Sequence, residues 1–223
     1  MPDLLSATRF LHQTALVFLG IAVSVTCGCS SVERTGNAQP MGLPSPTQSA
    51  SGNLPTDDVL ELATLYKSQN CVGFFKAFPS SFAQFDQLYG FDDNAGPRSF
   101  YSQYETHITY FLECSGVPAR QRLEKVIGIG IDGRWEADAS ALLQDGIYKL
   151  VRGHPNESKE ILDALPDAKA SSFWHFLFDG PHPDDKATAT AASKMSNALG
   201  EGSKQAKLLM IVYRNLRNER RVH

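Results

Sequence analysis

The sequence lacks the motifs of the common catalytic sites. It has no G-x-S-x-G nucleophile elbow and no H-E-x-x-H zinc pair, and the GEGSK segment at 200–204 has the wrong spacing for a phosphate loop. Gly128 and Gly130 lack the third glycine and the βαβ setting of a dinucleotide site. We therefore expect no bound cofactor or metal, and we do not expect the chain to be an enzyme.

The chain also lacks a strong charge of either sign. Its formal net charge is −3 over 223 residues, which is too small to suggest a nucleic-acid ligand. The charges are nevertheless unevenly placed, because adjacent aspartates occur at 57–58, 92–93 and 184–185 while Lys and Arg concentrate in 204–223. The simplest interpretation of this basic end is a helix whose cations match its dipole, followed by a solvated basic tail at 220–223.

The apolar run near the N-terminus is too short to cross a bilayer. The stretch that ends at Val25 (TALVFLGIAVSV) has about a dozen residues, whereas a spanning helix needs about twenty. The small residue Gly28 then directly precedes Cys29. An apolar stretch, a small residue and a cysteine in this order are typical of a secretory signal with a lipid-attachment cysteine. We therefore predict a signal peptide at 1–28 and an acylated mature N-terminus at Cys29.

On these residues the N-terminus resembles a bacterial lipoprotein precursor, in which cleavage before the cysteine frees its amino group and the thiol is diacylglycerated. The resemblance implies attachment to the membrane through the N-terminal lipid and a domain that faces the periplasm. Ser30 follows the lipid cysteine, which implies the outer membrane by the sorting pattern of enterobacterial lipoproteins. A soluble secreted protein with ordinary cleavage is the alternative.

Large apolar side chains are nearly missing from 30–53 (SSVERTGNAQPMGLPSPTQSASGN). Such a segment cannot bury enough surface to offset the entropy lost on ordering. We therefore expect 29–53 to be a lipidated N-terminus followed by a disordered tether. One globular domain of ordinary size follows, over 54–219.

Cysteines are few in this domain. With Cys29 lipidated and Cys27 removed with the signal peptide, Cys71 and Cys114 remain. An even pair in an oxidising compartment is most simply a disulfide, which here would close a loop of about 43 residues. Two buried free thiols are the alternative.

Helical spacing of apolar residues is found almost everywhere in the domain. An example is the set at i, i+3, i+4 and i+7 formed by Val59, Leu62, Ala63 and Tyr66. Pro79 and Gly90 are typical helix stop signals. We predict an all-α fold of eight to ten short helices, in a helical-hairpin or superhelical bundle. A short strand at 126–135 is the alternative there, because this stretch holds Gly128, Gly130 and the Asp132-Gly133 turn signal.

The densest polar group lies at 174–185 (WHFLFDGPHPDD). His175 and Asp179 are four residues apart on one helix face, and His182 and Asp184 could approach from the following turn. Imidazole and carboxylate ligands of this kind can hold a divalent metal. The alternative is an ordinary helix C-terminus, with Asp184 capping the next helix.

Aromatic residues concentrate between 74 and 110. Helical spacing places most of them in the core together with His107, whereas Phe75, Phe91 and Tyr101 can fall outside the buried face. Exposed aromatic side chains with an acidic rim are typical of protein-binding surfaces. We predict such a surface at four residues around the turn that follows Gly90: Asp86, Phe91, Asp92 and Asp93. Plain core packing of the aromatic residues is the alternative.

Two segments, FFKAFPSSFAQFDQLYG at 74–90 and SFWHFLFDGPHP at 172–183, are similar to a loosely defined group of proteobacterial helical lipoproteins found among immunity proteins of interbacterial toxin systems. The resemblance implies a periplasmic protein that binds a cell-wall- or membrane-attacking toxin, and it supplies no catalytic residues. The sequence leaves two alternatives open. One is a scaffold or assembly lipoprotein of the envelope, and the other is an envelope-acting hydrolase with its site at 174–185.

Overall fold

The computed structural model describes residues 56–136 and 138–220. Cys29, the signal peptide and the tether predicted from the sequence lie outside the described residues, as do the last three residues of the basic tail. Within the part of the chain that is described, no helix combines the length and the apolar character needed to cross a membrane.

The all-α prediction is confirmed. In chain order the helices are α1 (Thr56–Lys67), α2 (Cys71–Ala77), α3 (Phe82–Tyr89), the 3-10 turn η1 (Tyr101–Gln103), α4 (Tyr104–Leu112), α5 (Ala119–Gly130), α6 (Asp138–Gly153), α7 (Pro155–Asp163), α8 (Asp167–Phe178), α9 (Lys186–Leu199) and α10 (Lys204–Arg220). Ten α-helices thus lie within 56–220, at the upper end of the predicted number.

The helix boundaries follow local sequence signals. The Ser81 hydroxyl accepts a hydrogen bond from the backbone N–H of Gln84 and so caps α3, which ends before Gly90. The N-cap of α9 is Asp185, whose carboxylate accepts from the N–H of Thr188 at 2.6 Å. The expectation that Asp184 caps this helix is therefore wrong by one residue.

The alternative of a strand at 126–135 is wrong. The chain is helical through Gly130, and this glycine lies close against α8. A Cβ atom on Gly130 would lie 2.8 Å from the Phe173 ring of α8. The helix then ends in a turn in which Asp132 has a φ of 59° and its N–H donates to the Ser172 hydroxyl at 2.7 Å. Tight packing of α5 against α8 thus outweighs the low helix propensity of glycine.

A two-stranded antiparallel ribbon follows α3, where no strand is predicted from the sequence. It consists of β1 (Phe91–Asp92) and β2 (Gly96–Pro97), with Phe91 opposite Pro97. The Asp92 carboxylate accepts from the backbone N–H groups of Asn94 and Ala95, both at 2.9 Å. A side chain that bonds its own turn in this way is a common means of closing a tight loop.

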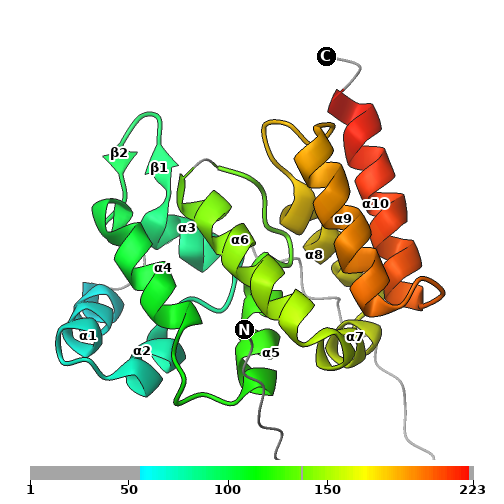
Figure 1. Cartoon of the computed structure of the whole chain (residues 1–223). Coiled ribbons are helices and arrows are strands. Elements are labelled where there is room, and N and C mark those ends of the chain that lie inside the picture. The colour runs from blue at the N-terminus through cyan, green and yellow to red at the C-terminus, as the bar shows by residue number, and fades with distance from the viewer. Residues whose placement is uncertain (1–55, 137, 221–223) are drawn as a thin grey trace, which may run out of the picture. The chain divides into compact units, whose positions relative to one another are not determined.

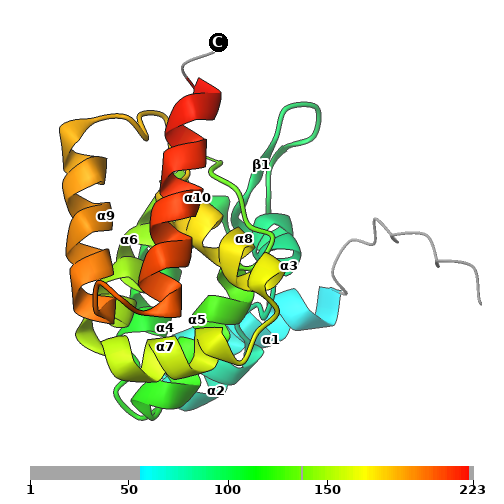
Figure 2. The same cartoon turned by 90° about the vertical axis from the view of Figure 1, so that its right-hand side faces the viewer.

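The helices form two groups that share α5 and α6. Helices α1 to α4 and the ribbon lie on one side of this central pair, and α7 to α10 lie on the other (Figure 1). The last helix, α10, runs beside α9 and packs across α8 (Figure 2). The α9–α10 pair therefore forms a helical hairpin at one end of the domain.

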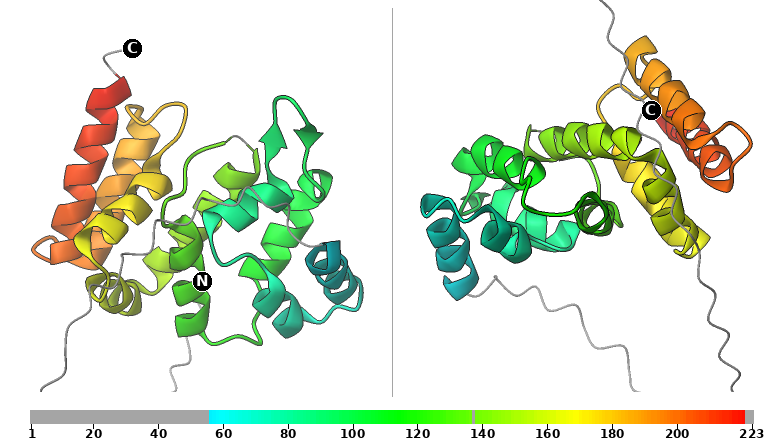
Figure 3. Two further views of the ribbon diagram at one scale, coloured as in Figure 1. Left: turned by 180° about the vertical axis from the view of Figure 1, so that it is seen from behind. Right: turned by 60° about the horizontal axis from the view of Figure 1, so that its bottom comes forward.

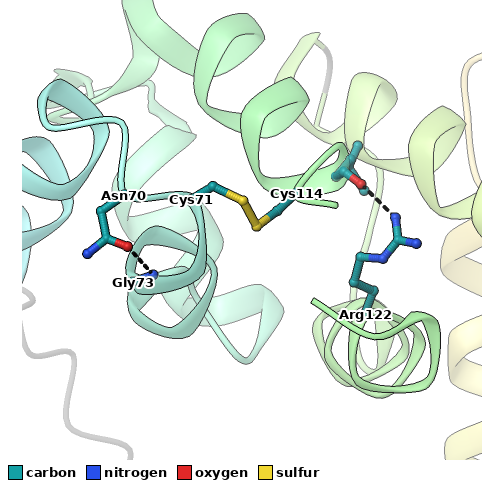
Figure 4. Close-up of a disulfide and its surroundings, with 6 residues drawn as sticks. Asn70, Cys71, Gly73, Cys114 and Arg122 are labelled. Carbon is teal, nitrogen blue, oxygen red and sulfur yellow. Dashed lines mark hydrogen bonds between the residues drawn. A yellow bond between two sulfur atoms is a disulfide. The ribbon is translucent and has the colours of Figure 1, made fainter. Parts of the chain in front are cut away.

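A covalent bond closes the first group. Cys71 at the start of α2 and Cys114 just after α4 form the predicted disulfide, with their Cα atoms 5.6 Å apart (Figure 4). Asn70 caps α2 beside the bridge through a hydrogen bond from the N–H of Gly73 at 2.9 Å. The Arg122 guanidinium of α5 donates a hydrogen bond to the carbonyl oxygen of Leu112, the last residue of α4. This bond connects α5 to the end of α4, close to the disulfide.

The core of the first group is built from aromatic rings. Phe78 and Phe111 stack with centroids 4.0 Å apart. His107 is a core residue, as predicted, with 2% of its surface exposed and the Tyr89 hydroxyl 3.1 Å from Nδ1. Burial lowers the pKa of His107 to about 4. The expectation that Phe75 could fall outside the core is wrong, because its ring is buried against Phe111.

Two close contacts attach the central helices to the first group. The Lys125 ammonium of α5 donates to the carbonyl oxygens of Phe75 and Lys76 at 2.7 and 2.8 Å, and so caps the end of α2. Burial lowers the pKa of Lys125 to about 8. At Gly146 of α6, an added Cβ would lie 2.1 Å from a methyl group of Leu112 in α4.

Candidate functional site

The ribbon exposes a large aromatic side chain. Phe91 is 56% exposed, although most rings of this part of the chain are buried. Its ring meets Tyr101 edge to face, with centroids 5.6 Å apart. The Tyr101 hydroxyl in turn donates to the Asp138 carboxylate of α6 at 3.3 Å. Phe91 is therefore an exposed ring that packs against a tyrosine, and this tyrosine is itself hydrogen-bonded to α6.

The two neighbouring aspartates have different roles. Asp92 accepts the two turn N–H groups described above, and its second oxygen pairs with Arg98 at 3.1 Å. The hydrogen bonds from Ala95 and Asn94 hold the pKa of Asp92 below its usual range. Asp92 thus maintains the shape of the ribbon, whereas the side chain of Asp93 is exposed to solvent.

The fourth predicted residue, Asp86, belongs to a charge cluster with residues distant in sequence. Its carboxylate is partly buried and lies 3.7 Å from the Arg134 guanidinium, which also pairs with Glu136. Burial, followed by hydrogen bonding to Asp86, raises the pKa of Glu136 to about 7. Asp86 is therefore engaged in contacts within the domain and is less exposed than Asp93.

Two of the four residues predicted to form a binding surface are thus exposed, and two further residues support the exposed ring. Phe91 and Asp93 are exposed on the ribbon, and Tyr101 and Asp138 stand behind the ring. Tyr101 could be suspected from its position outside the apolar face. Nothing in the sequence indicates Asp138 or Glu136, because both come about fifty residues later.

The polar segment at 174–185 lies beside a cavity of about 440 Å³ between α6, α9 and the loop before α9. His182 and Asp185 line this cavity together with Trp135, Asp145 and Tyr148, whereas His175 does not. In the ranges 56–136 and 138–220, no three His, Cys, Asp or Glu residues are grouped so that they could hold a metal ion. The structure therefore does not assemble the metal-ligand set considered from the sequence.

The carboxylates of this cavity are engaged in structural contacts. Asp185 caps α9, and Asp145 pairs with Lys149 at 2.5 Å. Asp179 accepts the backbone N–H of Trp135 at 2.9 Å. Gln144 donates hydrogen bonds to the carbonyl oxygens of Phe176 and Asp179 at the C-terminal end of α8. The polar groups that line the cavity therefore stabilise the helices and the loop that surround it.

A comparison with known protein families, with curated proteins and with solved structures found no match for this chain.

Proposed function

We propose that this chain is an envelope-anchored lipoprotein that faces the periplasm and acts by binding another protein. In this proposal it is an immunity or inhibitor protein that occludes a secreted antibacterial effector. The observation that supports it most is the exposed ring of Phe91. This residue lies on a ribbon whose turn is closed by Asp92, and its ring packs against Tyr101.

A supported aromatic ring suits a binding surface for a thermodynamic reason. Because Phe91 already rests on Tyr101, a partner that covers it orders few additional side-chain rotamers. The exposed carboxylate of Asp93 adds negative charge beside the ring. Enzymes that attack anionic walls or membranes are commonly basic, and this charge would steer a basic partner towards the ring. Occlusion of such a partner requires no acid–base group.

Co-culture tests the immunity assignment. Deletion of the gene should make cells lose to wild-type siblings that carry the effector, and expression of the wild-type chain should restore them. Phe91→Ser should fail to restore, because it removes the exposed ring. Leu60→Ser, which replaces a 67% exposed apolar residue on α1, should restore fully. A deletion strain that shows an envelope defect in monoculture and no disadvantage in co-culture would instead favour the scaffold function.

Charge at the surface is tested with Asp93 rather than Asp92, because reversal at Asp92 would open the turn. With a cognate effector in hand, Asp93→Lys should slow association and weaken its dependence on salt. Asp58→Lys, an exposed acid on α1, is the matched control and should leave the association rate within about twofold. Equal effects of the two substitutions would contradict a contact at the ribbon.

Attachment to the envelope is tested at Cys29. Mass spectrometry of the membrane fraction should detect a lipid-modified peptide that begins at Cys29, and Cys29→Ser should release the protein into the soluble periplasm. A mature protein that begins at another residue would refute the lipoprotein assignment without affecting the binding surface.

The second candidate function is hydrolysis of an envelope component in the cavity beside His182. One observation favours it, namely that an exposed imidazole lies in a cavity of about 440 Å³ with Trp135 and Tyr148. His182→Ala should then abolish the cellular phenotype, whereas His175→Ala, outside the cavity, should preserve it. Full activity of His182→Ala would exclude this function.

A further inference from the structure

The outward face of α10 carries a row of cations around one exposed apolar residue. Lys204, Lys207, Ile211, Arg214 and Asn218 are spaced three or four residues apart and so lie on one side of the helix. All five are exposed, and Ile211 is 52% exposed. The opposite side, with Leu209, Val212 and Leu216, is buried against the rest of the domain.

The helix dipole does not explain these cations. A dipole favours Lys and Arg in the last turn of a helix and disfavours them in the first. Lys204 and Lys207 are in the first turn of α10, so there they oppose the dipole. Lys204 is compensated by an ion pair with Asp167 at 2.7 Å. Lys207 and Arg214 form no ion pair with any described residue. The interpretation of the basic end as a dipole-matched helix therefore holds only for its final turn.

The positive charge is separated from the negative charge within the domain. Residues 186–220, which form α9 and α10, contain seven Lys or Arg and two Glu. Residues 56–112, which include α1 to α4 and the ribbon, contain seven Asp or Glu and three Lys or Arg. Helices α9 and α10 lie at the opposite end of the domain from α1 and α2 (Figure 3). The two faces therefore attract surfaces of opposite sign.

We propose that the outward face of α10 lies on an anionic phospholipid surface. Lys207 and Arg214 would lie among the lipid phosphates, and Ile211 between them would enter the headgroup layer. The exposed Ile211 favours a membrane over a nucleic acid, because a phosphate backbone offers no apolar layer to receive it. This inference goes beyond the proposed function. It concerns a different face from the ribbon and holds whether or not Cys29 carries a lipid.

Vesicle binding tests the contribution of the cations. The full chain is sedimented with vesicles that contain phosphatidylglycerol or only phosphatidylcholine. The double substitution Lys207→Glu with Arg214→Glu should weaken binding to the anionic vesicles about tenfold or more. The matched pair Lys67→Glu with Lys76→Glu makes the same change in net charge at exposed sites on α1 and α2, and should change binding less than about threefold. Equal losses in the two pairs would overturn the proposal.

Fluorescence tests the contact at α10 directly. Ile211→Trp should show a blue shift when anionic vesicles are added, because its ring enters the headgroup layer. Leu60→Trp, at the other strongly exposed aliphatic site, should show none. No shift at position 211, or equal shifts at both positions, would overturn the proposal. It would also be overturned if duplex DNA bound the chain tightly, competed with the vesicles and lost affinity with the same two charge reversals.

Discussion

Helices α2, α3 and α4 have seven, eight and nine residues, whereas α9 and α10 have fourteen and seventeen. Isolated helices shorter than about a dozen residues are marginal in water, so the short ones depend on what surrounds them. In the first group, these surroundings are a disulfide, a ring cluster and the capping ammonium of Lys125. In the second group, the long α10 packs on α8, which carries the buried Trp174, and hydrogen bonds run from Trp174 through Gln205 to Asp163. A single chemical change should therefore lower the stability of the first group more than that of the second.

The largest effect is expected from removal of the disulfide. Replacement of Cys71 and Cys114 by Ser should lower the free energy of unfolding by about 4 kcal/mol, because the unfolded chain regains the entropy of a loop that spans 43 positions. Denaturant titration measures the loss. Hydrogen exchange should show that α2 and α4 lose protection before α9 and α10. Uniform loss across both groups would contradict the comparison.

Acid should destabilise the first group next most strongly. The pKa of His107 is about 4 in the folded protein and about 6.5 in the unfolded chain. Between these values the unfolded chain binds the additional proton, so the contribution of His107 to the free energy of unfolding should fall as pH drops from 6.5 to 4, by up to about 3 kcal/mol. Thermal melts over this range test it. The double variant His107→Phe with Tyr89→Phe should lose this acid dependence, and His154→Gln should keep it.

A smaller effect is expected in the second group. Trp174→Phe removes the indole N–H that bonds Gln205 at 3.0 Å and leaves a buried amide oxygen without that donor. The expected loss is about 2 kcal/mol. Here hydrogen exchange should increase in α8 and α10 while α2 to α4 stay protected. If exchange instead increased first in α2 to α4, the two groups would unfold as one cooperative unit.

Glu136, just before α6, should give a change of opposite sign to that of His107. Its raised pKa of about 7 means that the folded protein holds a proton between pH 4.5 and 7, and stability is lost as the pH rises through this window. Glu136→Gln should therefore stabilise the protein at pH 8 by about 1 kcal/mol and have no effect at pH 4. Urea midpoints at the two pH values distinguish this from a substitution that acts equally at both.

The smallest effect on stability is expected at the proposed binding surface. Phe91→Ser should change the free energy of unfolding by less than about 0.5 kcal/mol, because the ring is mostly exposed and the turn is closed by Asp92 instead. A thermal melt provides the check. Asp92→Ala should cost more, since it leaves the turn N–H groups without their acceptor. The reverse order would show that Phe91 holds the ribbon rather than a partner.

Local signals made much of the fold predictable. The stop at Pro79, the end of α3 at Gly90 and the cysteine pair each depend on residue types with one strong conformational or chemical preference. The ribbon was missed because its two-residue strands are too short to show alternation. The helix through Gly130 was doubtful because its support comes from Phe173, more than forty residues later.

The candidate site was predictable to a smaller extent. Phe91 and Asp93 could be selected from the composition of one turn. The internal role of Asp92 depends on how that turn folds, and the pairing of Asp86 with Glu136 depends on tertiary contacts. Sequence spacing can therefore propose which side chains gather, but it does not reveal which of them are already bonded within the domain.

The near contact between Gly146 and Leu112 bears on how this sequence can vary. A methyl group at position 146 would overlap a terminal methyl group of the partly exposed Leu112, so alanine would require this side chain to change rotamer or α4 and α6 to separate. Substitutions at 146 should therefore be better tolerated in chains that carry a smaller residue at position 112. Residues 112 and 146 should then covary in related sequences, with a larger side chain at one position accompanying a smaller one at the other.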